Sequence, residues 1–331
     1  MSAKVSILVP IYNVSQFIER CAVSLFEQTF QDIEYIFVND CTPDDSIDVL
    51  NKVIARYPNR QSQIKIINHT ENKGIAFVRN NGIQNAKGIF IISVDGDDYI
   101  DENMVELMYS KALQANADIV VCDFLLEWEN VTKHAIQNIG NSKEDFLKLV
   151  LSFNTSVGLC NKMFKREIYI DHNIKAIDGC NMGEDFMICS QLVYYSNKIA
   201  KIDSPLYHYI QTNNTSYTKN ITKKSIKSVV EILNHLTLFF EEKTDYNSYR
   251  EFLLKGKLRK KIEFFMFSNS NDWKFISSVF RETDEVDDLS FLSFNEKNVN
   301  FFIEKKYYFL LKIYKNIYYK LFNLIQKLKG R

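Results

Sequence analysis

The strongest constraint on the fold is a regular alternation of short β-rich runs and helical patterns over the first 124 residues. Strands that alternate with helices at this spacing form βαβ units. The runs are almost continuously apolar, as expected of strands that are buried on both faces. The pattern therefore predicts an α/β fold with a mostly parallel sheet flanked by helices. The runs begin at Val5, Glu34, Ile64, Ile89 and Asp118, and the helical patterns cover 16–28, 45–57, 74–86 and 102–115.

Carboxylates cluster where the fourth predicted strand ends. The run IISVDGDD leads without a break into Asp95, Asp97 and Asp98. In open α/β sheets, ligands bind at the carboxyl ends of the strands. Carboxylate oxygens at that edge suit Mg²⁺ or Mn²⁺, which these residues would share with substrate phosphates. The alternative is an Asp-Gly turn whose acids are only solvated.

Other strand ends supply groups that suit a nucleotide diphosphate. Tyr12 offers a ring for stacking, Asp40 can accept a hydrogen bond from a base, and Arg79 can neutralise phosphate. In a parallel sheet these groups meet along one edge, and together they predict a nucleotide-diphosphate site. The sequence contains neither GxGxxG nor GxxxxGK[ST], which argues against dinucleotide and P-loop sites.

At these residues the sequence resembles the family 2 glycosyltransferases of the GT-A fold, of the bacterial polysaccharide-biosynthesis type. The resemblance rests on VSILVPIYN, IEYIFVNDCTPDDS, ENKGIAFVRNNG and IISVDGDD, and runs without a gap from about Val5 to Ile100. It resumes more weakly in NKMFKREIY, GEDFM and PLYHY, up to about Thr218. It implies a Rossmann-like GT-A enzyme that moves a hexosyl or N-acetylhexosaminyl group with inversion. The donor would be a nucleotide-sugar, commonly UDP-linked, and the acceptor a hydroxyl of a glycan or lipid-linked molecule.

The resemblance also implies roles for individual residues. Asp40 matches the acid that reads the base, and Asp95 and Asp97 match the DxD motif, with Asp95 towards the ribose and Asp97 on the metal. The family's usual DDGS is NDCT here, so Cys41 and Thr42 depart from the pattern and leave the conformation of that loop open. The residues assigned in this way to the nucleotide-sugar are Pro10, Tyr12, Asn13, Asp40, Arg79, Asn80 and Asp95.

The second motif, GEDF at 183–186, offers a general base. An acceptor hydroxyl must lose its proton as its oxygen attacks, and a nearby carboxylate can take that proton. The leaving UDP needs no acid, because the metal neutralises its phosphates. The resemblance assigns Asp185 as the base and Glu184 as support for the acceptor. The alternative is that both acids only favour the start of a helix.

Two further residues carry open alternatives. His208, in PLYHYIQ, is either a third metal ligand or phosphate contact, or a packed core residue between two tyrosines. Lys162 matches a family NK pair with Asn161, and either faces the acceptor or diphosphate or is a surface lysine.

The alternation breaks down after about Phe124, and from Lys219 the chain is helical in pattern. The sequence thus predicts a glycosyltransferase domain over 1–218, with a nucleotide-sugar half (1–100) and an acceptor half (101–218), and a helical region over 219–331. Residues 305–331 hold eight Lys or Arg and no acid, which leaves 33 basic and 41 acidic residues before them. A basic amphipathic helix over 305–330 would place Leu310, Ile313, Tyr314, Ile317, Leu321, Leu324, Ile325 and Leu328 on one face.

That face predicts either contact with an anionic membrane surface or docking on the catalytic body through the same stripe. The six cysteines form no CxxC pair, which is typical of reduced thiols in the cytoplasm, so the expected location is the cytoplasm or the inner face of the cell membrane. Nucleic acid is not an expected partner, because the body has no basic groove. The rival functions are a nucleotidyltransferase of related architecture and an inactive, membrane-docked sugar-binding or scaffold protein.

Overall fold

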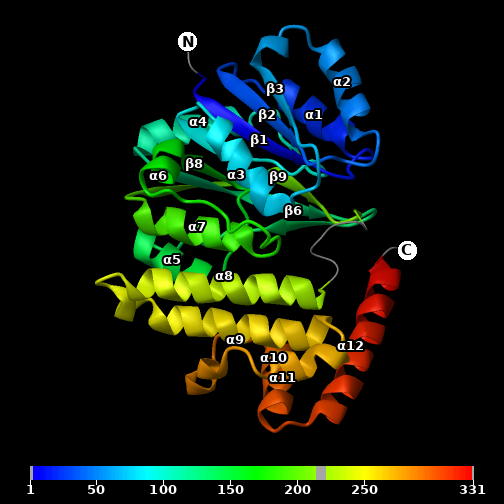
Figure 1. Ribbon diagram of the computed structural model, residues 1–331, viewed down its shortest axis with the longest axis vertical. Helices are drawn as coiled ribbons and strands as arrows, with labels where there is room; N and C mark the ends of the chain where they lie inside the picture. Colours follow the sequence, from blue (N-terminus) through cyan, green and yellow to red (C-terminus); the bar gives the residue numbers. More distant parts are fainter. Residues whose placement is uncertain (1–2, 214–220, 330–331) are drawn as a thin grey trace. The chain divides into compact units, whose positions relative to one another are not determined.

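The alternation of the first half builds one side of a mixed nine-stranded sheet within the residues that the structure describes (Figure 1). The computed structural model describes residues 3–213 and 221–329, with 322–329 described by backbone alone. The strand order is β3-β2-β1-β4-β8-β6-β9-β5, and β7 pairs with β6. The strands are β1 (Val5–Ile11), β2 (Ile33–Asn39), β3 (Ile64–Asn68), β4 (Phe90–Ser93), β5 (Tyr99–Ile100), β6 (Ile119–Glu127), β7 (Thr132–Ala135), β8 (Lys162–Lys165) and β9 (Ile199–Ile210).

The prediction of an α/β fold is confirmed, and the parallel part of the sheet is the part that the alternation covers. β1 pairs in parallel with β2 and β4, and β2 with β3. The short strand β8 then enters antiparallel between β4 and β6, so the sheet as a whole is mixed. A four-residue strand inside an irregular stretch has no periodicity of its own, which is why the sequence did not predict it.

The first of two compact units comprises 3–150 and 155–213 of the described chain, and its helices cover both faces of the sheet. Val5, Ile7, Val9 and Ile11 share one core with α1, α2 and α4, whereas Gly82 of α3 packs close to Leu8 on the opposite face. The four predicted helices begin and end within two residues of the observed ones. The helix α5 begins after Ser142, whose Oγ accepts the Asp145 N–H (3.1 Å). The helices are α1 (Ile18–Phe26), α2 (Ser46–Arg56), α3 (Ile75–Asn85), α4 (Met104–Ala115), α5 (Lys143–Leu151), α6 (Arg166–Asp171) and α7 (Glu184–Tyr195), with a 3₁₀ turn η1 (Gln61–Gln63).

The register brings the carboxyl ends of the parallel strands to one edge. Ile11 of β1 pairs with Asn39 of β2, which pairs in turn with Asn68 of β3. The chain moves outward from β1 to β3 and then returns to the other side of β1 as β4. The order of the strands therefore reverses beside β1, which is the point where open α/β sheets bind their ligands.

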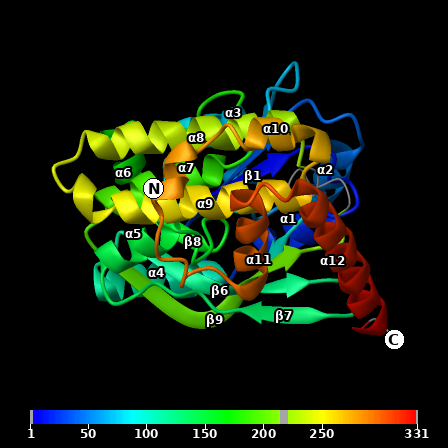
Figure 2. The same cartoon turned by 90° about the horizontal axis from the view of Figure 1, so that it is seen from below.

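A second compact unit comprises 151–154 and the chain from 216 onward. Its other helices pack around α9, which Figure 2 shows along its length. Gly256 of α9 lies so close to the Leu151 carbonyl that a Cβ would come within 2.1 Å of its oxygen. The predicted boundary at 218 falls in 214–220, outside the described residues. Among the described helices, none has the length and apolar character needed to cross a membrane. The elements are α8 (Lys223–Glu241), η3 (Tyr246–Ser248), α9 (Arg250–Phe267), η4 (Ser270–Asp272), α10 (Trp273–Ile276), η5 (Arg281–Glu285), α11 (Phe294–Glu304) and α12 (Tyr308–Lys329).

Candidate active site

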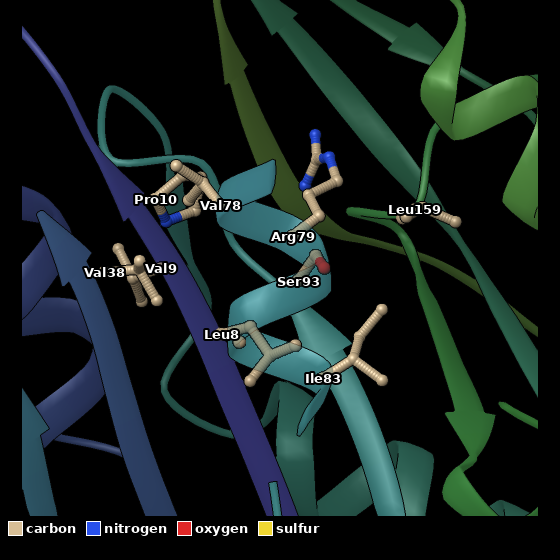
Figure 3. Close-up of a pocket in the computed structure, with 10 residues that line it drawn as sticks. Leu8, Val9, Pro10, Val38, Val78, Arg79, Ile83, Ser93 and Leu159 are labelled. Carbon is tan, nitrogen blue, oxygen red and sulfur yellow. The ribbon is translucent and has the colours of Figure 1, made fainter. Parts of the chain in front are cut away.

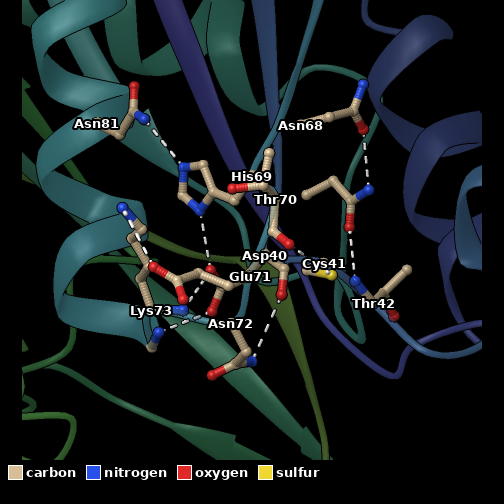
Figure 4. A network of polar contacts seen from close by, with 12 residues as sticks. Asp40, Cys41, Thr42, Asn68, His69, Thr70, Glu71, Asn72, Lys73 and Asn81 are labelled. Carbon is tan, nitrogen blue, oxygen red and sulfur yellow. Dashed lines mark hydrogen bonds and ion pairs between the residues drawn. The ribbon is translucent and has the colours of Figure 1, made fainter.

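Asp40 follows β2 and organises the loop between β3 and α3 (Figure 4). Its buried carboxylate accepts the backbone N–H groups of Lys73 (2.9 Å) and Gly74 (2.8 Å) and pairs with His69 Nδ1 (2.8 Å). The other ring nitrogen of His69 lies 2.9 Å from Asn81 Nδ2. A carboxylate has about four acceptor positions, so these three contacts leave room for about one more, such as a base N–H. The sequence did not indicate His69 or Asn81 as part of this site.

The loop after Asp40 has a residue with left-handed backbone conformation that is not a glycine. Cys41 has φ +54° at the position where the family usually has glycine. Thr42 Oγ1 accepts the Asn13 N–H (2.8 Å) and donates to Asp44 Oδ1 (2.6 Å). Burial alone would raise the pKa of Asp44, but hydrogen bonds from Ser46, Thr42 and nearby backbone N–H groups hold it well below its usual range. The NDCT variant therefore ties the loops after β1 and β2 together.

The remaining residues after β1 also lie at this edge. Pro10 is in β1, and a Cβ on Gly96 would come within 2.9 Å of the Pro10 carbonyl oxygen, so the two loops approach closely. Tyr12 is exposed, which leaves its ring accessible for stacking. Asn13 has φ +56°, a conformation that asparagine tolerates better than most residues.

The three acids after β4 differ in their environments. Asp98 is fully buried, accepting the Tyr207 hydroxyl (2.5 Å) and the Ile210 N–H (2.8 Å). Burial, and then the charges of Asp97 and Asp95, raise the pKa of Asp98 well above its usual range. Asp95 and Asp97 are partly exposed, and Asp97 accepts Asn213 Nδ2 (2.8 Å). Asp98 thus fastens β9 to the site, while the two other carboxylates keep part of their surface exposed.

Arg79, on α3, connects the DxD motif to the GEDF motif. Its Nη2 donates to Asp95 Oδ1 (3.3 Å) and its Nε donates to Glu184 Oε1 (3.2 Å). The same Nε lies 2.9 Å from Asp185 Oδ1, although within the described chain that oxygen receives no hydrogen bond. The guanidinium is buried, which opposes its charge, but the three carboxylates raise the pKa of Arg79 well above its usual range. One fixed cation is therefore shared among three acids.

The two acids of GEDF respond to this environment. Burial, reinforced by the charge of Asp185, raises the pKa of Glu184 to about 7. Burial also raises the pKa of Asp185, and Arg79 opposes that shift. Gly183, with φ +93°, turns the chain into α7 so that both carboxylates lie in its first turn. The Asp185 side chain keeps 24% of its surface exposed, so an incoming group can reach it.

Two predicted site residues have neighbours that the sequence did not indicate. Asn80 donates to the Ala176 carbonyl (2.9 Å) and Asp178 (3.0 Å), and so anchors the loop before α7. Lys162 is fully buried rather than on the surface, and its Nζ donates to the carbonyls of Ser156 and Gly158.

His208 contacts two carboxylates outside the DxD motif. Its ring nitrogens contact Glu127 Oε1 (2.6 Å) and Asp101 Oδ1 (2.8 Å), and its ring stacks on Tyr99 (4.1 Å between centroids). Nowhere in the described chain do three or more His, Cys, Asp or Glu side chains form a group that could hold a metal. A metal role for His208 would require its ring to leave Glu127 and Asp101.

A small pocket beside Arg79 has mostly apolar walls (Figure 3). It lies between β1 and α3, next to the charged cluster around Arg79. Its lining residues are Leu8, Val9, Pro10, Val38, Val78, Arg79, Gly82, Ile83, Ser93 and Leu159.

One sheet edge thus gathers partly exposed aspartates, an exposed aromatic ring and a second carboxylate pair, which is the type of site expected of a glycosyltransferase of the GT-A fold. The profile of "Glycosyl transferase family 2" matches residues 6–172, and the chain belongs to this family. It is similar to the putative glycosyltransferase EpsH of Bacillus subtilis, with 28% identity over 282 residues, covering 82% of this chain and 77% of the relative.

Solved structures share the fold. The chain is similar to Staphylococcus aureus TarS 1–349 in complex with UDP-GlcNAc (TM-score 0.69, 17% identity, 86% of this chain and 83% of that one). It is also similar to the mannosyltransferase PcManGT from Pyrobaculum calidifontis in complex with GDP-Man and Mn²⁺ (TM-score 0.54, 13% identity, 97% and 88%). The predicted GT-A fold and glycosyltransferase class are confirmed.

Proposed function

We propose that this glycosyltransferase is an inverting, metal-dependent enzyme that transfers a sugar from a UDP-sugar to a hydroxyl of a glycan or lipid-linked acceptor in cell-surface polysaccharide synthesis. The observation that carries the proposal is the cluster in which Arg79 joins Asp95 to Glu184 and Asp185. In this cluster one guanidinium contacts both the carboxylate expected at the donor and the carboxylates expected at the acceptor, which supports the proposal. The UDP-GlcNAc complex of TarS supports the choice of donor.

The residues at the end of β4 fit a divalent cation. Asp95 and Asp97 offer partly exposed oxygen donors, whereas Asp98 is committed to Tyr207 and Ile210. Mg²⁺ and Mn²⁺ commonly bind one or two protein carboxylates and complete their shell with substrate phosphates and water. When bound, such an ion would neutralise the charge that develops on the leaving diphosphate. The Mn²⁺ complex of PcManGT supports this assignment.

Asp185 is the proposed general base. A carboxylate accepts a proton more readily as its pKa rises towards the working pH, and burial raises the pKa of Asp185. Arg79 opposes that rise. Glu184 accepts the Arg79 Nε–H and thereby fixes the direction of the guanidinium. A single base on the acceptor side suits direct displacement, which inverts the anomeric carbon.

The donor side is proposed to use the exposed Tyr12 ring, the remaining acceptor position of Asp40, and Asp95 towards the ribose. Pro10 and Asn13 would line the same pocket. Asn80 contributes by anchoring the loop at 176–178.

The experiment measures UDP and GDP release from a panel of nucleotide-sugars, with and without Mn²⁺, after thermal-shift screening has identified the donor that stabilises the protein. Asp97→Asn should abolish turnover and the Mn²⁺ dependence of donor binding. Asp185→Asn should lower kcat by about 100-fold or more, with donor affinity within a few-fold. Near-native turnover of Asp97→Asn would contradict the metal assignment, and equal loss of donor binding in Asp185→Asn would contradict the base assignment. A protein that binds donor but never turns it over would favour the inactive sugar-binding alternative.

A further inference from the structure

The C-terminal helix α12 docks within the second unit through one face only. Leu311 is fully buried, and the Tyr308 ring lies against Phe265 and Trp273, with centroids 6.0 and 6.1 Å away. Lys315 Nζ donates to the Ser268 carbonyl on the same side. Positions 308, 311 and 315 recur at helical spacing and therefore share one face. Tyr314 of the predicted stripe also contacts this unit, because its hydroxyl donates to Asn295 Oδ1 (3.0 Å).

The opposite face of α12 presents apolar side chains to solvent. Leu310, Ile313, Ile317 and Leu321 are each 42–53% exposed, and Phe309 is 75% exposed. At 100° per residue these five lie roughly opposite Leu311 and Lys315. We call them the outer stripe. The further stripe positions Leu324, Ile325 and Leu328 have side chains outside the described residues.

Positive charge surrounds the outer stripe. Lys305, Lys306, Lys312 and Lys320 are exposed, and residues 305–331 contain no acid. Exposed aromatic rings continue the apolar surface at the turn into α12, where Phe301 and Tyr307 lie 6.2 Å apart. An exposed apolar stripe with aromatic rings and lysines at its flanks is typical of helices that lie in a membrane interface.

We propose that the outer stripe of α12 is a lipid-binding surface that inserts among the headgroups of an anionic bilayer. The lysines around the outer stripe favour an anionic bilayer over a second copy of the chain as its partner. A two-fold contact through the outer stripe would set the same lysine-rich helix against itself. An anionic bilayer supplies the opposite charge over the whole stripe, at about 1 kcal/mol, or about fivefold in affinity, for each lysine near its surface.

The test measures binding of the full chain to phosphatidylcholine vesicles with and without phosphatidylglycerol, by co-sedimentation at low and high salt. The protein should bind only the phosphatidylglycerol vesicles, and less strongly in high salt. Ile313→Ser/Ile317→Ser/Leu321→Ser should weaken binding by about 100-fold. Lys312→Gln/Lys320→Gln should weaken it by about fivefold per charge.

Matched controls lie on α8, where Leu238 is 62% exposed and Lys224 and Lys227 are exposed. Leu238→Ser and Lys224→Gln/Lys227→Gln should bind vesicles like the unmodified chain, and all variants should melt at similar temperatures because the changed side chains are exposed. Failure of the unmodified chain to bind anionic vesicles, or unchanged binding by the stripe variant, would overturn the proposal. A dimer in analytical ultracentrifugation that the stripe variant dissociates, and that vesicles do not compete with, would assign the stripe to a second copy instead.

Discussion

Two buried cations in the first unit, Arg79 and Lys162, occupy different environments. The Arg79 guanidinium lies among the carboxylates of Asp95, Glu184 and Asp185. Lys162 Nζ is surrounded by neutral oxygens, at 2.9 Å from the Ser156 carbonyl, 2.6 Å from the Gly158 carbonyl and 2.8 Å from Asn161 Oδ1. A guanidinium has five donors in a rigid plane and can serve several acids at once, whereas an ammonium is a compact charge.

The difference separates a residue that contacts the acids of the site directly from one that mainly holds the frame around them, although the charge of Lys162 also opposes the rise in the pKa of Asp185. Arg79 opposes the rise in the pKa of both Glu184 and Asp185. Lys162 closes the turn at 156–161, next to the strand β8 that lies between β4 and β6. We therefore expect Arg79 to govern the pH dependence of turnover and Lys162 to govern stability.

Arg79→Met should have the largest effect on activity. Without the guanidinium, burial and mutual repulsion raise the pKa of Glu184 and Asp185 further, so the base is protonated at neutral pH. We expect kcat/KM at pH 7 to fall by about 100-fold or more and to recover partly as the pH rises. The measurement is a pH–rate profile of donor-dependent transfer. A profile that keeps its shape while only its height changes would make Arg79 a phosphate contact and not a positioning residue.

Lys162→Met should act mainly on stability. Methionine fills a similar volume but leaves the carbonyls of Ser156 and Gly158 without their donor. Hydrogen bonds to a charged group contribute about 1.5–3 kcal/mol each. The apolar contacts of the methionine side chain offset part of this loss, so the free energy of unfolding should fall by about 2–4 kcal/mol. Urea unfolding measures that loss, and transfer assays well below the melting temperature should show kcat within a few-fold. A large loss of turnover in a stable Lys162→Met protein would move Lys162 into the catalytic machinery.

Arg79 and Lys162 also show which features of the structure can be predicted from the sequence and which cannot. The parallel half of the sheet and its helices were predictable, because periodicity and strand-end polarity are local signals. The pairing of Arg79 with Glu184 spans 105 residues, and no local pattern encodes it. Lysine is rarely buried, so the sequence left position 162 open between a surface lysine and one that faces the acceptor or diphosphate. Helical periodicity places Leu310, Ile313 and Ile317 on one face of the last helix. It does not show that the opposite face docks within the second unit through Leu311 and Tyr308.

Glu184→Gln should have the smallest effect and is the sharpest test of how the shared cation works. The amide oxygen of glutamine can still accept the Arg79 Nε–H, so the guanidinium keeps its direction, but one negative charge beside Asp185 is removed. Like charges raise each other's pKa, so its removal should lower the pKa of Asp185 and shift the acidic limb of kcat/KM to lower pH. Activity should rise with pH through that limb in both proteins, because the base acts unprotonated, and kcat at neutral pH should stay within about tenfold. The two acids titrate as a pair in the unmodified protein, so its limb should be broader than that of the variant. A fall in kcat of about 100-fold or more would instead mean that Glu184, with a pKa of about 7, accepts the proton itself.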